Sequence, residues 1–329
     1  MSPQGVFTVS IMDSHPATNV AVPPGIPAGA VAAYNLVRDP VAAEQYTREL
    51  AHGHYENFSV ISQLLPRYLR QDFCNIYAFC RIADDLGDEV HDPALSLKLL
   101  ADFRRRTEEC YNSSPTTNLF VALARTIHRH DIPPEPFLDL IDAFEQDQKV
   151  TRYDSFDQVL DYCRRSADPV GRLVLYMCGY RDPERQRLAD KTCTALQLIN
   201  FWQDIERDLA ERDRVYLPAD SMRYFGVSVQ QLRDGRVDDN FRRLLKFECD
   251  RVADLFAQGR ELLPLIRLSL RPQIALFDLG GAAVLRAIRR ADYDTLSHRP
   301  ALSKMDKLRL LAPAVIGSFM TSLFPRRFV

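Results

Sequence analysis

The sequence predicts an all-α fold, and three observations support this prediction. Between residues 41 and 325, apolar side chains recur at intervals of three and four positions, which places them on one face of each helix. Short proline-containing groups, such as "HDPA" at residue 91 and "DIPPEP" at residue 131, separate these stretches as turns between helices would. Runs of alternating apolar and polar residues, which are typical of strands, are missing from the sequence.

The N-terminal segment differs from the rest of the chain. Residues 1–40 contain six of the 20 prolines and, before Arg38, a single charged side chain at Asp13. No basic stretch precedes an apolar run, so this segment does not have the pattern of a signal peptide. We expect a flexible leader over residues 1–40, and a single helical domain over residues 41–329, because no linker divides the remainder.

Charge and cysteine content exclude several classes of protein. The chain has 42 Lys and Arg against 44 Asp and Glu, a net charge of −2, so nothing indicates a nucleic-acid binder. The seven cysteines form no CxxC pair and their number is odd. This pattern argues against a disulfide framework or a zinc site and favours a reducing, cytoplasmic environment.

The first unusual helix ends in a crowded group of acids. The stretch "RIADDLGDE", Arg81–Glu89, follows an apolar and aromatic run with no loop signal between them. At about 100° per residue, one face of this helix carries a polar stripe, with Asp85 and Glu89 at its edges. The members of that stripe are Tyr77, Arg81, Asp84 and Asp88.

A second acidic stretch, "NFWQDIERD", occupies Asn200–Asp208, again in an apolar helical context. We expect one helix to continue through it, with a second polar stripe beside large apolar residues. Its members are Gln197, Asn200, Asp204 and Asp208.

Two interpretations of these stripes remain open. They are either the solvent-exposed faces of two amphipathic helices or the two sides of one binding site. The acids lack the lysines, four residues on, that exposed helices often carry, and their neighbours are large and aromatic. If the stripes face each other, their carboxylate and amide oxygens suit Mg²⁺, which also bridges to substrate phosphates. Without His or Cys, zinc and iron are poor candidates.

The C-terminal stretch, residues 308–329, is apolar but is interrupted by Pro313. Because of this interruption, its continuous apolar run falls short of the ~20 residues that a membrane span needs. Arg309, Arg326 and Arg327 flank it and would suit a helix lying at the inner face of the membrane. A terminal helix packed on the domain is the alternative.

Taken together, the two acidic motifs resemble those of the squalene/phytoene synthase family, over about Tyr46–Leu310. Asp84 and Asp88 match its first motif, DxxxD, and "NxxxDxxxD" at residues 200–208 matches its second. "DRVYLP" and "YCRRSADPVGRL" match two further family segments. The resemblance implies an isoprenoid-synthase helical bundle around a central cavity, with Mg²⁺ and a prenyl diphosphate bound there. Pro169 and Gly171 are expected to break or kink the helix in the second of these segments.

Within the family, "GHYENFSV", Gly53–Val60, is similar to the bacterial hydroxysqualene synthases of the hopanoid pathway. That similarity implies ionisation and rearrangement of presqualene diphosphate, capture of the cation by water, and release of diphosphate. Glu56 and Gln203 stand where squalene synthases carry basic residues, which leaves charge for only one diphosphate. We expect no nicotinamide cofactor. We do expect functional coupling to a presqualene diphosphate synthase.

The resemblance and the stripes together give the expected site residues. The expected metal ligands are Asp84, Asp85, Asp88, Asn200, Asp204 and Asp208. The expected substrate contacts are Asn57, Phe58, Arg81, Ser166, Ala167, Val170, Gly171, Gln197, Gln203, Arg214 and Tyr216. The expected catalytic residues are Tyr77 and Tyr162, whose rings would stabilise a cation, and Glu56, which with Asn57 would hold the water and accept its proton. His54 is an alternative for this last role.

Two other functions remain open at this point. The first is a head-to-head condensing enzyme that makes presqualene diphosphate or phytoene from two prenyl diphosphates. The second is a non-catalytic scaffold that binds prenyl lipids, although the intact motif acids argue against it. For Glu56, a plain position on a helix surface is the alternative.

Overall fold

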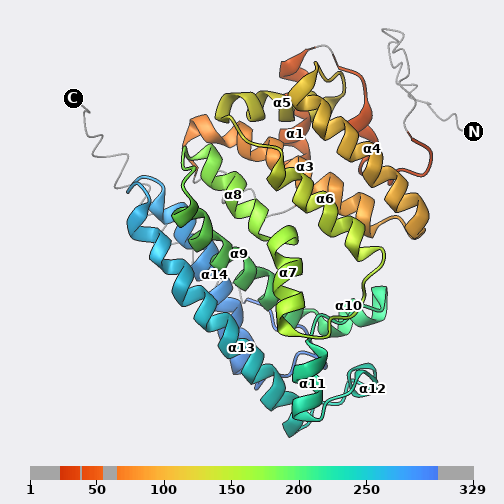
Figure 1. The fold of residues 1–329 in the computed structure, drawn as a ribbon, viewed down its shortest axis with the longest axis vertical. Helices are drawn as coiled ribbons and strands as arrows, with labels where there is room; N and C mark the ends of the chain where they lie inside the picture. The colour runs from red at the N-terminus through yellow and green to blue at the C-terminus, as the bar shows by residue number, and fades with distance from the viewer. Residues whose placement is uncertain (1–22, 38, 55–64, 303–329) are drawn as a thin grey trace, which may run out of the picture.

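The structure is a computed structural model that describes residues 23–37, 39–54 and 65–302. Within these ranges it is entirely helical apart from isolated bridges between Leu36 and Thr117 and between Arg152 and Val215. The predicted all-α class is therefore confirmed for the described chain. Figure 1 shows α1, α3, α4 and α5 at one end of the molecule and α11 and α12 at the other.

The helices fall into two groups along the chain. The first group is η1 (Val31–Tyr34), α1 (Pro40–His54), η2 (Arg67–Leu69), α3 (Arg70–Asp88), α4 (Pro93–Asn112), α5 (Asn118–His130) and α6 (Glu135–Asp147). The second group is α7 (Phe156–Ser166), α8 (Asp168–Met177), α9 (Pro183–Gln203), α10 (Ile205–Arg212), α11 (Ala219–Phe225), α12 (Val229–Arg233), α13 (Asp239–Gly259), η3 (Arg260–Leu265) and α14 (Arg271–Arg290).

Two apolar clusters fill the interior, and α9 contributes to both. The first cluster centres on Phe79, whose ring meets that of Phe137 edge-on at 4.9 Å between ring centres. The second surrounds Trp202, which is completely buried. Leu188 of α9 belongs to the first cluster and Leu198 to the second, so one helix ties both cores together. The single domain expected over residues 41–329 stays a prediction.

Residues 23–37, which belong to the expected leader, pack against the helical domain. Ala30, Ala33 and Tyr34 are at most 1% exposed and belong to the first cluster. Tyr34 also meets the ring of Phe120 edge-on. The structure therefore differs from a flexible leader over residues 23–37. Small alanines can bury themselves without helical periodicity, which is why the sequence pattern gave no sign of it.

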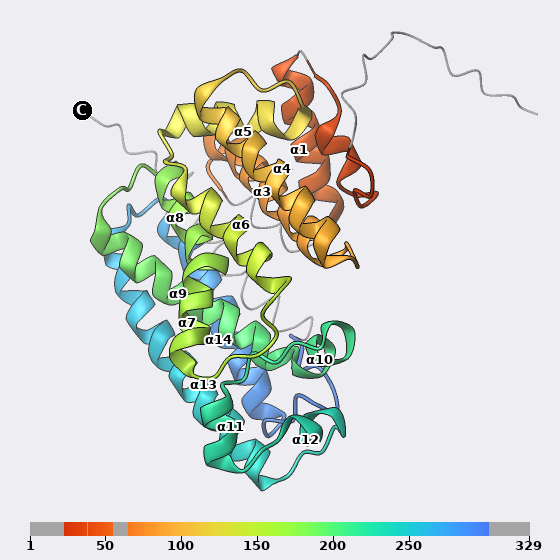
Figure 2. The same ribbon diagram turned by 45° about the vertical axis from the view of Figure 1, so that its right-hand side comes forward.

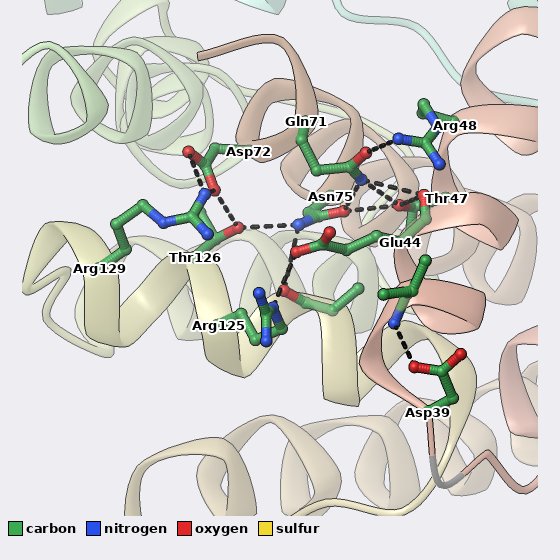
Figure 3. A network of polar contacts seen from close by, with 12 residues as sticks. Asp39, Glu44, Thr47, Arg48, Gln71, Asp72, Asn75, Arg125, Thr126 and Arg129 are labelled. Carbon is green, nitrogen blue, oxygen red and sulfur yellow. Dashed lines mark hydrogen bonds and ion pairs between the residues drawn. The ribbon is translucent and has the colours of Figure 1, made fainter. Parts of the chain in front are cut away.

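A buried polar network fixes how α3 sits between α1 and α5 (Figure 3). Asn75 accepts hydrogen bonds from Thr47 of α1 and from Gln71, and donates to Thr126 of α5 at 2.9 Å. One turn earlier, the fully buried Asp72 accepts from Thr126 and Arg129. Satisfied buried polar groups favour one arrangement over others, so α3 is held in one rotation about its axis.

Candidate active site

The acids of α3 point in different directions. Asp84 is 44% exposed and Asp88 20%, whereas Asp85 is almost completely buried. Arg81 pairs with Asp85, and its guanidinium also lies 3.5 Å from Asp84 and 3.0 Å from Glu89. The first stripe thus leaves Asp84 and Asp88 partly exposed, while Asp85 is committed to an internal ion pair.

The second acidic stretch is not one helix, and that prediction is wrong. α9 ends at Gln203, α10 begins at Ile205, and Asp204 between them has φ −110° and ψ 18°. The backbone still bonds across the joint, because Asp204 N–H donates to Asn200 at 2.9 Å and Asp208 N–H to Asp204 at 2.8 Å. The chain therefore bends at Asp204 and places Asp208 on a separate short helix.

Two arginines join the acidic stretches. Arg212 lies 3.2 Å from Asp88 and 4.0 Å from Asp208, and Arg214 lies 3.0 Å from Asp88. Burial and the neighbouring Asp204, with a smaller contribution from Asp88, raise the pKa of Asp208 to about 7. The Arg212 guanidinium therefore bridges the two stretches, and the backbone N–H of Arg214 donates to the Asp208 carbonyl oxygen at 3.0 Å.

One sequence argument for a metal site is weaker than expected. The acids lack lysine partners, but Arg212 follows Asp208 by four residues and contacts it. Arg299, from the segment after α14, makes a two-pronged ion pair with Asp204, with Nη2 at 2.9 Å from Oδ2. Arginines therefore pair with these acids instead of the lysines that the sequence lacks.

The side chains at this site suit a Mg²⁺ ion that is bound by a diphosphate as well as by the protein. Within the described ranges, no three His, Cys, Asp or Glu side chains group closely enough to hold a metal ion by themselves. Mg²⁺ is usually bound by one or two carboxylates, with phosphate oxygens and waters completing its shell. Partial burial, with a smaller contribution from nearby Asp88, raises the pKa of Asp84 to about 6, and a bound cation would favour its charged form.

A buried group that the sequence did not reveal lies beside these acids. The hydroxyl of Tyr162 donates to Asp147 at 2.6 Å, and Arg214 donates to the Asp147 carbonyl oxygen at 3.1 Å. Burial raises the pKa of the Asp147 carboxyl to about 7, although Arg214 opposes the shift. Beyond them, Tyr216 stacks on Phe201 with 3.6 Å between ring centres.

An apolar cavity of about 240 Å³ lies between α8, α9, η3 and α14. Five predicted substrate-binding residues line it: Ser166, Ala167, Val170, Gly171 and Gln197. Most other lining residues are Val, Leu, Ile, Phe or Ala, and the exceptions include the ion pair of Arg260 with Asp278. Because Gln197 is one turn before Asn200 on α9, the cavity and the acids follow each other along this helix.

The expected break between α7 and α8 is confirmed. α7 ends at Ser166, Ala167 leaves the helical region, and Pro169 lies in the first turn of α8. Gly171 is instead inside α8, where a Cβ atom would come within 2.6 Å of the Cys193 sulfur. It allows α8 to approach α9 closely beside the cavity.

The remaining predicted residues are placed as follows. Tyr77 packs against the small cluster of Ala51 and Cys74. Gln203 is buried and donates to the carbonyl oxygen of Pro300. Glu56, Asn57, Phe58 and the stretch 308–329 lie outside the described residues. Of the helices that the structure describes, none has the length and apolar character needed to cross a membrane.

Sequence reasoning missed Asp147, Arg212 and Arg299. Arg212 could have been found from its spacing of four from Asp208. Asp147 and Arg299 have no local signal, because only the packing of distant segments brings them to the site.

Comparison with known proteins agrees with this geometry. The squalene/phytoene synthase family profile matches residues 51–306. A phytoene synthase of Thermus thermophilus is 33% identical over 84% of this chain and 92% of its own length. The crystal structure of squalene synthase HpnC from Alicyclobacillus acidocaldarius is 44% identical, with a TM-score of 0.74 over 78% of this chain and 96% of that one.

A dehydrosqualene synthase crystallised with a ligand superposes with a TM-score of 0.76 over 86% of this chain, at 23% identity, and supports the fold alone. The fold is the isoprenoid-synthase helical bundle expected from the motifs. The extent of the family match and the identity of these relatives lead to one conclusion: the chain belongs to the squalene/phytoene synthase family, whose enzymes act on prenyl diphosphates.

Proposed function

We propose that this protein is a hydroxysqualene synthase, which ionises and rearranges presqualene diphosphate, captures the cation with water and releases diphosphate. The observation that carries the proposal is the pair of acidic stretches, bridged by Arg212, next to an apolar cavity. The acids suit a metal-bound diphosphate, and the cavity suits a hydrocarbon chain, which gains about 0.8 kcal/mol for each buried CH₂. The 44% identity to squalene synthase HpnC supports a role in squalene rather than phytoene formation within the family.

The proposed chemistry begins with loss of the diphosphate. Enzymes of this family are typically Mg²⁺-dependent, and here Asp84, Asp88, Asp204 and Asp208 with Asn200 would hold the metal. When bound, Mg²⁺ would supply Lewis acidity toward the departing diphosphate. Arg212 and Arg214 keep Asp88 and Asp208 oriented and add positive charge near the leaving group.

After ionisation, this chain's own residues must shelter the cation. The stacked rings of Phe201 and Tyr216 offer π-faces that attract positive charge. Tyr162 is held by Asp147, which fixes the direction of its hydroxyl. Water then adds through its oxygen to the carbon cation, and its proton passes to a base. Glu56, assisted by Asn57, remains our proposed base; unchanged hydroxysqualene yield from a Glu56→Gln variant would remove it from that role.

Head-to-head condensation is the second candidate, and the similarity to several phytoene synthases favours it. Gln203 argues for the first candidate. Its neutral side chain is occupied by the Pro300 carbonyl, so it offers no positive charge to a second diphosphate. Coupling to a presqualene diphosphate synthase and contact with the inner membrane face belong to the same proposal.

The deciding experiment is mass spectrometry of products from presqualene diphosphate and Mg²⁺, with and without a nicotinamide cofactor. We expect hydroxysqualene in both reactions. Squalene formed only with the cofactor would contradict hydration. In a parallel reaction with farnesyl diphosphate, any C30 product would establish the condensing function. No diphosphate release from either substrate would favour a non-catalytic scaffold.

A further inference from the structure

The segment that follows α14 turns back onto the acidic site. At its start, Asp292 and Tyr293 both adopt left-handed backbone conformations, with φ of 50° and 59°. Arg242 of α13 holds this turn by donating to the Asp292 carbonyl oxygen at 2.7 Å. Figure 2 shows the chain after α14 running back toward α10. Leu296 then buries its side chain in the second apolar cluster.

The end of this returning segment is attached to the second acidic motif at two adjacent points. Gln203 donates through Nε2 to the carbonyl oxygen of Pro300, and Asp204 pairs with Arg299. Two adjacent residues of the returning segment, Arg299 and Pro300, thus contact two adjacent residues of the motif, Asp204 and Gln203. Gln203 is 4% exposed, whereas the Arg299 side chain is 52% exposed.

Because Gln203 is buried and Arg299 is exposed, the Gln203–Pro300 hydrogen bond supports the Arg299–Asp204 ion pair rather than the reverse. An exposed ion pair is worth little, because water screens it and two flexible side chains lose freedom in forming it. A buried amide bonded to a backbone carbonyl holds the chain itself in place, and losing that bond leaves a desolvated acceptor. The Arg299 backbone is therefore fixed from the neighbouring position, which raises the concentration of its guanidinium near Asp204.

We propose that Gln203 is a positioning residue that holds Arg299 on Asp204, and so sets how readily Asp204 accepts a divalent cation. A cation that binds Asp204 must compete with the guanidinium for the same two oxygens. Loosening the segment weakens that competition. The positioning part of the proposal stands on geometry alone, and the part about cations rests on the proposed function.

The first test measures hydrogen exchange of backbone amides in residues 294–299 of the metal-free full-length protein. Gln203→Met keeps the length of the side chain but removes its donor, and Gln203→Glu serves if the first variant folds poorly. Gln231→Met is the matched control, because Gln231 is also buried and donates to a backbone carbonyl, that of Arg236, at 3.1 Å. We expect faster exchange in this segment for the Gln203 variants only. Equal exchange in wild type and the Gln203 variants, or the same increase in the control, would overturn the proposal.

The second test measures Mn²⁺ binding, without diphosphate, by electron paramagnetic resonance. Arg299→Met is expected to tighten Mn²⁺ binding by about two- to fivefold, the range that corresponds to losing an exposed ion pair. Gln203→Met should tighten it by a smaller factor and should have no further effect in the Arg299→Met background. An equal effect of Gln203→Met in both backgrounds would contradict action through Arg299.

The two tests separate the inference from the proposed function. If neither wild type nor any variant binds Mn²⁺, the metal-dependent function fails and with it the part of the inference about cations. The exchange measurement then still decides whether Gln203 positions the segment.

Discussion

At the scale of single residues, the most unusual group is the carboxyl of Asp147. It is buried, receives the Tyr162 hydroxyl and lies beside the Arg214 guanidinium, 3.9 Å away. Its pKa of about 7 means that near neutral pH it is divided between the protonated and the charged form. In the unfolded chain the same carboxyl has lost its proton above about pH 4.

This difference predicts a pH-dependent stability. Between about pH 4 and pH 7 the folded state binds more protons at Asp147 than the unfolded state does, so its contribution to stability falls as pH rises. Asp147→Asn removes this contribution, and urea unfolding should show the variant gaining stability relative to wild type from pH 5 to pH 8. Tyr162→Phe retains the carboxyl and should keep the wild-type slope. Parallel pH profiles for Asp147→Asn and wild type would contradict the assignment.

Arg212 and Arg214 offer a matched comparison, because both contact Asp88 but differ in burial. The Arg214 side chain is 10% exposed and that of Arg212 is 27% exposed. We expect Arg214→Met to lower the free energy of unfolding by about 3–5 kcal/mol, since it removes the positive charge beside the buried Asp147 carboxyl. Arg212→Met should cost less than about 1 kcal/mol. Denaturant unfolding at one pH measures both, and equal losses would show that burial does not decide the effect.

At the scale of helices, the contact between α8 and α9 at Gly171 controls one wall of the cavity. Gly171→Ala places a methyl group against the Cys193 sulfur, and we expect a loss of about 1–3 kcal/mol from overpacking. Adding Cys193→Ala should restore most of it. Gly280→Ala on α14 is the control, because a Cβ there meets no atom within 4 Å. It should be neutral or stabilise the helix by up to about 1 kcal/mol. Thermal unfolding of the four proteins tests this.

Helical periodicity predicted the elements well where the pattern was regular and failed where a bend kept helical hydrogen bonds. The end of α3 follows directly from "RIADDLGDE". The joint at Asp204 does not, because the backbone bonds on both sides of it continue and no Pro or Gly marks it. The ordered residues 23–37 were missed for a different reason: contacts with α5 and its neighbours, rather than local preference, hold Tyr34 in place.

At the scale of the molecule, the candidate site joins the two groups of helices. Asp84 and Asp88 come from α3, whose orientation depends on the network around Asn75, and Asp204 and Asp208 flank the start of α10. Motif spacing predicted that these acids belong together. It could not supply Asp147 or Arg299, because residues far apart in the sequence meet only after α6 and the segment after α14 have packed.

A ligand that bridges the two groups should stabilise the whole protein. We expect Mg²⁺ with inorganic pyrophosphate to raise the melting temperature, by an amount equivalent to about 2.7 kcal/mol when the ligand is at 100 times its dissociation constant. Asp88→Asn should remove most of this increase. Glu184→Gln, an exposed acid at the start of α9, should retain it. An increase of the same size in Asp88→Asn would show that the ligand binds elsewhere.

The arginines on the acidic stretches have a consequence for how the protein is assembled. Arg81, Arg214 and Arg299 already balance Asp85, Asp88 and Asp204 in the metal-free chain. We therefore expect folding not to require a divalent cation, unlike that of small metalloproteins whose folding is driven by the metal. Binding of the proposed Mg²⁺ would then be an ion exchange within a folded protein, in which one positive charge replaces another.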